Sequence, residues 1–185
     1  MDNKSKKHLT SALKLYKLYL KNFPKVPEAY DLRYYMAEVQ FYFKNYDIAA
    51  DEYYTVSRMN GKYRKTAALS AVASMKNIID SSKYGKLPPL GQVGSPIEVP
   101  ENKIKYIKML DSFVELLPKD KKGHTMRYSA AYTLFEYGHY KDANQRFENI
   151  IKLIPGTKQG RSSVKMMIGY HTEKKQWDEL IRSEE

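Results

Sequence analysis

The sequence predicts an all-α fold of stacked helix hairpins, and three observations support this prediction. An aromatic residue, an alanine, a second aromatic and a β-branched residue recur at steps of three, four and three, which places each set on one helical stripe. The sets begin at positions 9, 46, 103, 140 and 177, so their spacings are 37, 57, 37 and 37 residues. A helix-ending Pro or Gly lies fifteen residues after the start of each of the first four sets.

Two copies of the pattern are close to each other, and the others are looser. The close copies are Tyr46, Ala49, Tyr53 and Val56 before Gly61, and Tyr140, Ala143, Phe147 and Ile150 before Pro155. The looser copies are Leu9, Ala12, Tyr16 and Tyr19 before Pro24, then Lys103, Tyr106, Leu110 and Phe113 before Pro118, and finally Trp177 with Leu180. Each copy predicts the second helix of a hairpin.

A second kind of helical segment precedes each copy after the first. These segments cover residues 28–45, 62–80, 124–139 and 160–175, and each contains small or flexible residues suited to close helix contact. Those residues are Met36 and Ala37, Ala73 and Ser74, Ala130 and Ala131, and Met167 to Gly169. Because a single hairpin cannot bury its own apolar stripe, the hairpins are expected to stack.

The elements follow in order along one predicted domain, residues 1–185. Residues 5–24 are the second helix of a truncated repeat, 27–61 form a repeat, 62–118 a repeat with an insertion at 83–103, 123–155 a repeat, and 158–185 a partial repeat. Since the chain starts on a second helix and stops within a repeat, we expect a fragment of a longer protein. The alternative is a natural chain whose end helices act as caps.

These motifs resemble the tetratricopeptide repeat (TPR), a helix–turn–helix unit of about 34 residues. The resemblance implies a right-handed superhelical solenoid of about four hairpins, here with a period of 37 residues. Gln40, Arg33 and Arg127 depart from the apolar residues usual in the family. The repeat positions that the resemblance assigns as structural are Ala12, Tyr16, Pro24, Ala37, Tyr46, Ala49, Tyr53, Ala131, Gly138, Tyr140, Ala143, Phe147 and Pro155.

A narrower resemblance concerns the order of the second repeat, the following helix, the proline-rich break and the helix after it. This order is similar to TPR proteins of predatory and gliding deltaproteobacteria, which belong to cell-envelope or motility assemblies. It implies a bacterial protein, with the periplasm or cell envelope favoured and the cytoplasm left open. The absence of cysteine is compatible with both compartments.

The composition narrows the class of protein without identifying a ligand. The net charge is +11, and residues 1–25 contribute +6 of it through seven Lys and one Asp. Such a basic face could attract nucleic acid, anionic lipid or an acidic protein, while scattered lysines also fit a solvated exterior. No apolar run approaches the roughly 18 residues that a membrane-spanning helix needs, so direct membrane insertion is not expected.

No group of residues in the sequence has the spacing of an active site. We therefore expect no enzymatic activity, no cofactor and no bound metal. The four histidines, His8, His124, His139 and His171, form no metal-binding pair, and there is no cysteine. Residues 156–160, GTKQG, follow no strand and lack the Gly-Lys-Ser/Thr of a phosphate-binding loop. Its glycines more simply end one helix and open the next.

A protein-binding surface is therefore the predicted functional feature. By resemblance, the first helix of each hairpin lines a concave groove, whose exposed residues would include Tyr34, Glu38, Tyr42, Met75, Tyr128, Tyr132 and Glu136. Two roles are open for Phe41 and Phe135, packing between hairpins and binding of a partner. The expected partner is a protein or peptide with acidic and apolar residues, not a small-molecule substrate. The alternative is a basic, tyrosine-rich module that binds nucleic acid by base stacking and phosphate contacts.

The stretch KYGKLPPLGQVGSPIEVPENK, residues 83–103, interrupts the period by twenty residues. Its Pro and Gly content is typical of a linker. The repeat spacing favours an insertion inside the third hairpin instead, with a helix starting at Pro100 and Glu101. Two interpretations remain: a tolerated loop, or a segment held against the repeats by Leu87, Leu90, Val93, Ile97 and Val99.

Overall fold

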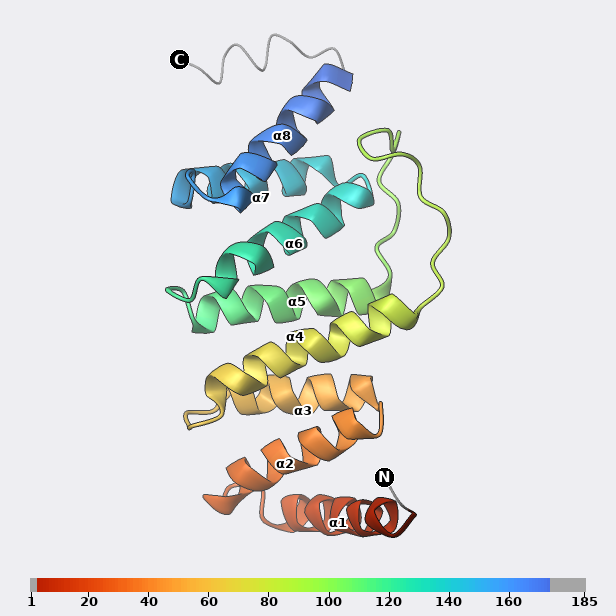
Figure 1. The fold of residues 1–185 in the computed structure, drawn as a ribbon, viewed down its shortest axis with the longest axis vertical. Helices are drawn as coiled ribbons and strands as arrows, with labels where there is room; N and C mark the ends of the chain where they lie inside the picture. The colour runs from red at the N-terminus through yellow and green to blue at the C-terminus, as the bar shows by residue number, and fades with distance from the viewer. Residues whose placement is uncertain (1–2, 174–185) are drawn as a thin grey trace. The chain divides into compact units, whose positions relative to one another are not determined.

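The computed structural model describes residues 3–173, and these residues form eight α-helices and no strand (Figure 1). The helices are α1 (Asn3–Asn22), α2 (Glu28–Tyr42), α3 (Tyr46–Arg58), α4 (Arg64–Ser81), α5 (Glu101–Leu116), α6 (Lys122–Glu136), α7 (Tyr140–Leu153) and α8 (Lys158–Glu173). The predicted all-α class is confirmed. No helix in the described part of the chain is long and apolar enough to cross a membrane.

The chain divides into two compact units, Met1–Ser82 and Lys83–Glu185. The division falls at the start of the Pro- and Gly-rich stretch, so α4 and α5, which were expected to form one hairpin, belong to different units. The prediction that residues 1–185 form a single domain stays a prediction.

In the first unit, α1 packs against α2, α2 against α3 and α3 against α4 (Figure 1). The predicted stripe of α3 is buried at Ala49, Tyr53 and Val56, and faces the neighbouring helices. Ala37 on α2 is fully buried, as a close helix contact requires. At α1 the stripe is only half-buried at Ala12 and Tyr16, where α1 packs on α2.

The second unit is built from α5 to α8 in the same sequential manner. Its core cluster contains the predicted repeat residues Ala131, Tyr140, Ala143 and Phe147, together with Val93, Phe135 and Ile150. Phe135 is therefore a packing residue, which decides between the two roles considered for it. The partial repeat contributes α8, whereas Trp177 and Leu180 lie outside the described residues.

The turns between α2 and α3 and between α6 and α7 have the same backbone conformation. Lys44 and Gly138 occupy the left-handed region with φ of 61° and 76°. The following residues, Asn45 and His139, share φ of −78° with ψ of 61° and 56°. In both turns this second residue donates its N–H to a carbonyl five residues earlier, that of Gln40 in one turn and of Leu134 in the other.

Helix ends lie close to the predicted stop residues. α1, α5 and α7 end at Asn22, Leu116 and Leu153, each two residues before the predicted proline. Gly61 is an exception, because α3 already ends at Arg58 and Met59 is extended with φ −79° and ψ 153°. Gly61 therefore has a role other than stopping the helix.

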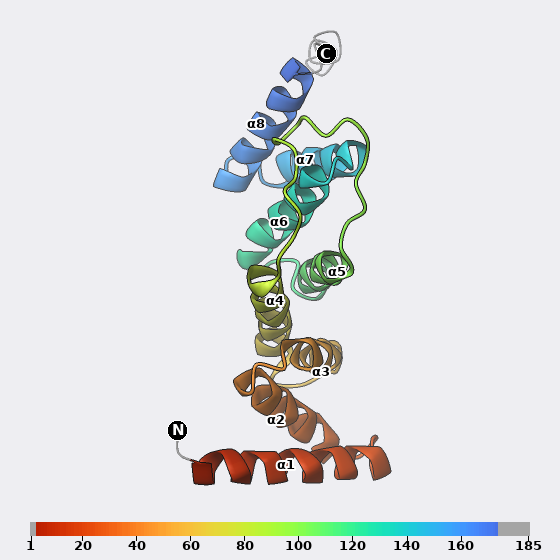
Figure 2. The same ribbon diagram turned by 90° about the vertical axis from the view of Figure 1, so that its right-hand side faces the viewer.

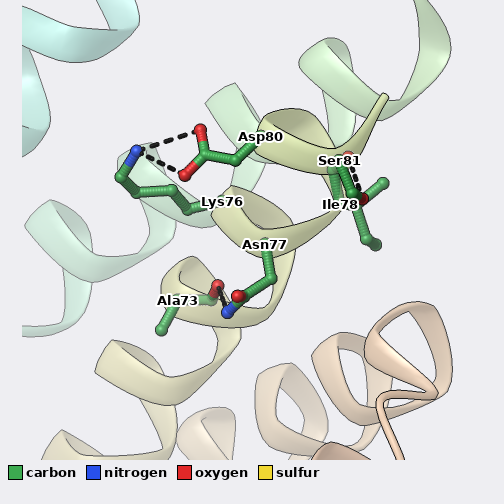
Figure 3. A network of polar contacts seen from close by, with 6 residues as sticks. All are labelled: Ala73, Lys76, Asn77, Ile78, Asp80 and Ser81. Atoms are coloured by element: carbon green, nitrogen blue, oxygen red, sulfur yellow. Dashed lines mark hydrogen bonds and ion pairs between the residues drawn. The ribbon is translucent and has the colours of Figure 1, made fainter. Parts of the chain in front are cut away.

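The last turns of α4 are stabilised by polar side chains that bond back to the helix (Figure 3). Asn77 donates to the carbonyl of Ala73 at 2.9 Å, and Ser81 donates to the carbonyl of Ile78 at 3.0 Å. Lys76 and Asp80 form an i,i+4 ion pair at 2.9 Å. The Ser81 hydroxyl thus supplies a donor to a carbonyl in the last turn of α4, a helix end that has no glycine cap.

The proline-rich stretch is held against the end of the α6–α7 hairpin (Figure 2). Val93 and Val99 are buried, and Ile97 packs against the core cluster of the second unit. Leu87 is half-buried, but the expectation for Leu90 is wrong, because its side chain is 44% exposed. Helix α5 begins at Glu101 directly after Pro100, as predicted.

Candidate functional site

Four tyrosines of the first unit form a surface that we call the tyrosine cluster: Tyr30, Tyr34, Tyr35 and Tyr63. Tyr30 and Tyr34 are four residues apart on α2 and share a face, and Tyr63 directly precedes α4. The rings of Tyr34 and Tyr63 stack with centroids 3.9 Å apart, and Tyr30 stacks with Tyr63 at 5.7 Å. Helix α2 and the residue that precedes α4 thus contribute to one aromatic surface.

Hydrogen bonds fix the tyrosine cluster in addition to ring stacking. The backbone N–H of Tyr63 donates to the hydroxyl of Tyr30 at 2.7 Å. The hydroxyls of Tyr35 and Tyr63 are hydrogen-bonded to each other at 3.0 Å. Tyr35 nevertheless remains 42% exposed, so part of its ring is available to a partner.

Gly61 allows the close approach of Tyr30 to the α3–α4 connection. A Cβ at position 61 would lie 2.6 Å from Cε1 of Tyr30, closer than real Cβ contacts come. Only glycine leaves room for the Tyr30 ring at its present place. Gly61 was predicted only to end a helix, and its contact with Tyr30 was not predicted.

Charged residues of both signs surround the tyrosine cluster. Glu38 accepts a hydrogen bond from the Tyr53 hydroxyl at 2.5 Å. Burial, together with the nearby charge of Glu38, raises the pKa of Tyr34 to about 12, so its hydroxyl keeps its proton at neutral pH. Lys62 pairs with Asp31 at 3.0 Å, and its amino group lies 4.8 Å from the centroid of the Tyr63 ring.

Two of the unusual repeat residues have polar partners within the first unit. Gln40 is 1% exposed, and its side-chain oxygen accepts a hydrogen bond from the amide of Asn45 at 2.8 Å. Arg33 on α2 pairs with Glu52 on α3 at 2.7 Å. These departures from an apolar residue therefore stabilise the α2–α3 hairpin, because a buried polar group with a partner avoids the cost of desolvation.

The second unit carries a smaller aromatic pair, Tyr128 and Tyr132 on α6. Their ring centroids are 6.0 Å apart, and Tyr128 also packs on Phe147 at 5.7 Å. Both tyrosines are half-buried, and burial raises the pKa of each. Tyr128 thus takes part in the packing between α6 and α7, while the pair remains a candidate surface.

Glu136 interacts with other residues of the second unit. It lies 3.8 Å from the amino group of Lys103, which is 4.8 Å from the ring centroids of both Tyr84 and Tyr137. Burial raises the pKa of the Glu136 carboxyl, and the charge of Lys103 partly opposes this shift. These contacts connect the beginning of the proline-rich stretch to α5 and α6.

The structure brings some of the predicted binding residues together and separates others. Tyr34 belongs to the tyrosine cluster, and Glu38 is close to it. Tyr42 is 51% exposed and contacts Phe43 instead. The expectation for Met75 is wrong, because its side chain is fully buried and offers no surface to a partner.

Sequence reasoning missed Tyr30, Tyr35 and Tyr63 as members of one surface. The spacing of Tyr30 and Tyr34 on one helical face was a usable signal. Tyr63 could not be placed from periodicity, because it lies in the connection before α4 and reaches α2 only through the tertiary fold.

A groove of about 870 Å³ lies between α7 and α8, separate from the aromatic surfaces. Its apolar lining comes from Ile151, Val164, Met167 and Ile168, with polar residues that include Lys141, Glu148 and His171. Within residues 3–173, no group of three or more His, Asp or Glu residues is placed to hold a metal ion.

Comparison with known proteins gives no family for this chain. No protein-family model matches the sequence, and a comparison with curated proteins yields no match either.

Proposed function

We propose that this chain is a non-catalytic TPR-type scaffold whose tyrosine cluster binds a segment of a protein or peptide partner. The observation that carries the proposal is the rigid, partly exposed surface of four tyrosines from α2 and the start of α4. Tyrosine buries a large area with only two side-chain torsions, so a fixed tyrosine surface binds at a small entropy cost.

Repeated local geometry supports the TPR-type part of the proposal. The α2–α3 and α6–α7 turns share their backbone conformation at Lys44 and Gly138. The ends of α5 and α7 also correspond, since Leu117 and Ile154 are 37 residues apart and have φ of −134° and −143° with ψ of 61° and 51°. A right-handed solenoid with a 37-residue period and a concave surface from the first helices is the architecture that we propose from these correspondences.

The partner chemistry follows from the neighbours of the tyrosine cluster. An acidic partner was expected because the sequence places Lys and Tyr in the predicted groove. Near the cluster, however, Asp31 and Glu38 accompany Lys62, so both signs of charge are present. We therefore propose a segment with apolar side chains and exposed backbone carbonyls, which tyrosine rings and hydroxyls can contact together.

Partner capture with matched tyrosine variants tests this function. The full chain would serve as bait beside Tyr35→Ala and the control Tyr54→Ala, which removes a half-buried tyrosine on α3 outside the cluster. A second bait would combine Tyr34→Ala with Tyr128→Ala, which removes one tyrosine from each of the two candidate aromatic surfaces. Quantitative mass spectrometry should show proteins captured by the wild type and Tyr54→Ala but depleted at least tenfold with Tyr35→Ala. Equal capture by both single variants, with both folded by circular dichroism, would contradict the proposal.

Nucleic-acid binding is the alternative function, favoured by the basic charge and the abundant tyrosines. Base stacking needs a free ring face. Tyr63 stacks with Tyr34 at 3.9 Å and with Tyr30 at 5.7 Å, so its ring is already engaged by tyrosines. Binding that falls steeply with salt would favour nucleic acid, whereas weak salt dependence would favour a protein partner.

The setting that we propose is a bacterial cell-envelope or motility assembly, with the periplasm favoured over the cytoplasm. This part of the proposal depends on the narrower resemblance alone. Fractionation of cells that express the tagged protein from its native locus would test it, and recovery from the cytoplasmic fraction alone would contradict it.

A further inference from the structure

The groove between α7 and α8 is a surface of the second unit that the proposed function does not use (Figure 1). Its α8 side is lined by Val164, Met167, Ile168 and His171, which stand at positions i, i+3, i+4 and i+7 and so share one helical stripe. Val164 is 38% exposed and Ile168 is 47% exposed. The described part of the chain therefore leaves this apolar stripe incompletely covered.

An equivalent stripe earlier in the same unit is covered by a helix. The position 37 residues before Ile168 is Ala131 on α6, which is fully buried in the core cluster. Helix α7 packs against α6 and contributes Tyr140, Ala143 and Phe147 to that cluster. A helix that follows α8 at the same spacing would cover Ile168 in the way that α7 covers Ala131.

The chain beyond α8 carries the apolar pattern that such a helix needs. Residues 174–185 have the sequence KKQWDELIRSEE, and Trp177 lies 37 residues after Tyr140, with which α7 begins. Trp177, Leu180 and Ile181 are spaced by three residues and one, so a helix places all three on one face. Because α8 forms one wall of the groove, the segment that follows α8 starts beside the groove.

Charge favours this segment over helix α1 of a second copy as the occupant of the groove. Two lysines, Lys141 and Lys152, line the α7 side of the groove together with one acidic residue, Glu148. Residues 177–185 contain four acidic residues and one arginine, so their net charge is −3. Helix α1 also exposes apolar side chains, but residues 1–25 have a net charge of +6 and would meet these lysines with like charge.

A buried acceptor in the groove also fits this segment. The side-chain oxygen of Asn144 on α7 is buried and accepts no hydrogen bond from the described residues. Trp177 carries an indole N–H, a donor that needs a partner when the ring is buried. We propose that residues 177–185 pack as an amphipathic helix into the α7–α8 groove, with Trp177, Leu180 and Ile181 facing its apolar lining. The groove is then closed within one copy, and a helix of another molecule enters it only by displacing this segment.

The fluorescence of Trp177, the only tryptophan of the chain, tests this packing. In the full chain its emission should be blue-shifted relative to that of a free peptide of residues 174–185, with severalfold weaker quenching by acrylamide. Ile168→Glu places a charge in the groove and should return both values toward those of the peptide. The control Gly169→Glu, with nothing within 4 Å of the added Cβ, should leave them unchanged. Peptide-like emission from the wild type, or the same emission from both variants, would overturn the inference.

Photocross-linking provides a second readout, which needs no charge in the groove. Benzoylphenylalanine in place of Val164 should cross-link to the tryptic peptide of residues 176–182, whereas the same replacement of Gly169 should not. Irradiation in a mixture with isotope-labelled chain identifies the source of that peptide. Adducts between labelled and unlabelled chains would show that a second copy fills the groove, and this result, or no adduct from position 164, would overturn the inference. Neither experiment involves the tyrosine cluster, so their failure would leave the proposed function unchanged.

Discussion

Two features favour glycine at position 138 in the α6–α7 turn. Its φ is 76°, and a Cβ there would lie 2.6 Å from Cγ1 of Val93. We predict that Gly138→Ala lowers the free energy of unfolding by about 2–4 kcal/mol, from left-handed strain and overpacking. Urea unfolding measures the loss. Gly94→Ala, next to Val93 and with nothing within 4 Å of the added Cβ, is the control and should change stability by less than about 0.5 kcal/mol.

Tyr34 makes stability depend on alkaline pH. Burial and Glu38 raise its pKa from 10.0 to about 12, so the unfolded chain loses this proton first as the pH rises. The contribution of the neutral hydroxyl is complete below pH 10 and decreases between pH 10 and 12. We predict a smaller loss of unfolding free energy over this range in Tyr34→Phe than in the wild type. Equal losses in urea unfolding at pH 9 and 11 would contradict the predicted coupling.

Residue roles were predictable where the local period determines them. Ala49, Tyr53 and Phe147 are buried because their helical stripe must face a neighbouring helix, which the sequence alone requires. Met75 was misplaced because the period does not say which side of α4 meets α3. Tyr35 and Tyr63 were missed because their contact joins residues 28 positions apart, across two helices and a connection.

Among the elements, the proline-rich stretch is the one whose contacts were predicted in part. Its predicted limits, 83–103, followed from the repeat spacing, and the start of α5 followed from Pro100 and Glu101. Val93, Ile97 and Val99 hold it as expected, but Leu90 does not. The apolar residues of this stretch have no regular spacing, so in an irregular segment the sequence does not determine which of them turn inward.

The bond between Val93 and Tyr140 anchors this stretch, and Tyr140→Phe tests it. The variant keeps the ring but removes the acceptor for a buried N–H, which costs about 1–3 kcal/mol. We predict faster hydrogen–deuterium exchange across residues 92–98 and a lower unfolding free energy. Tyr46→Phe, at the corresponding repeat position of the first unit, should leave exchange in this stretch unchanged. Equal protection in both variants would show that the bond does not anchor the stretch.

For the whole molecule, the sequence predicted helix hairpins with repeated turns, because both stripe and stop residues recur at one period. The Lys44 and Gly138 turns share their conformation although only one carries glycine. The division after Ser82 was not predicted, because it depends on tertiary contacts between residues far apart in the sequence. Such contacts between distant residues are not encoded in the period.

The central claim is that the tyrosine cluster binds a partner protein, and site-specific photocross-linking tests it most directly. A benzoylphenylalanine residue would replace Tyr35 in one full-length chain and the control Tyr54 in another, and both would be irradiated in cells of the source. We predict a discrete cross-linked partner from position 35 and none from position 54. Absence of any adduct at position 35, or the same adducts from both positions, would contradict the claim.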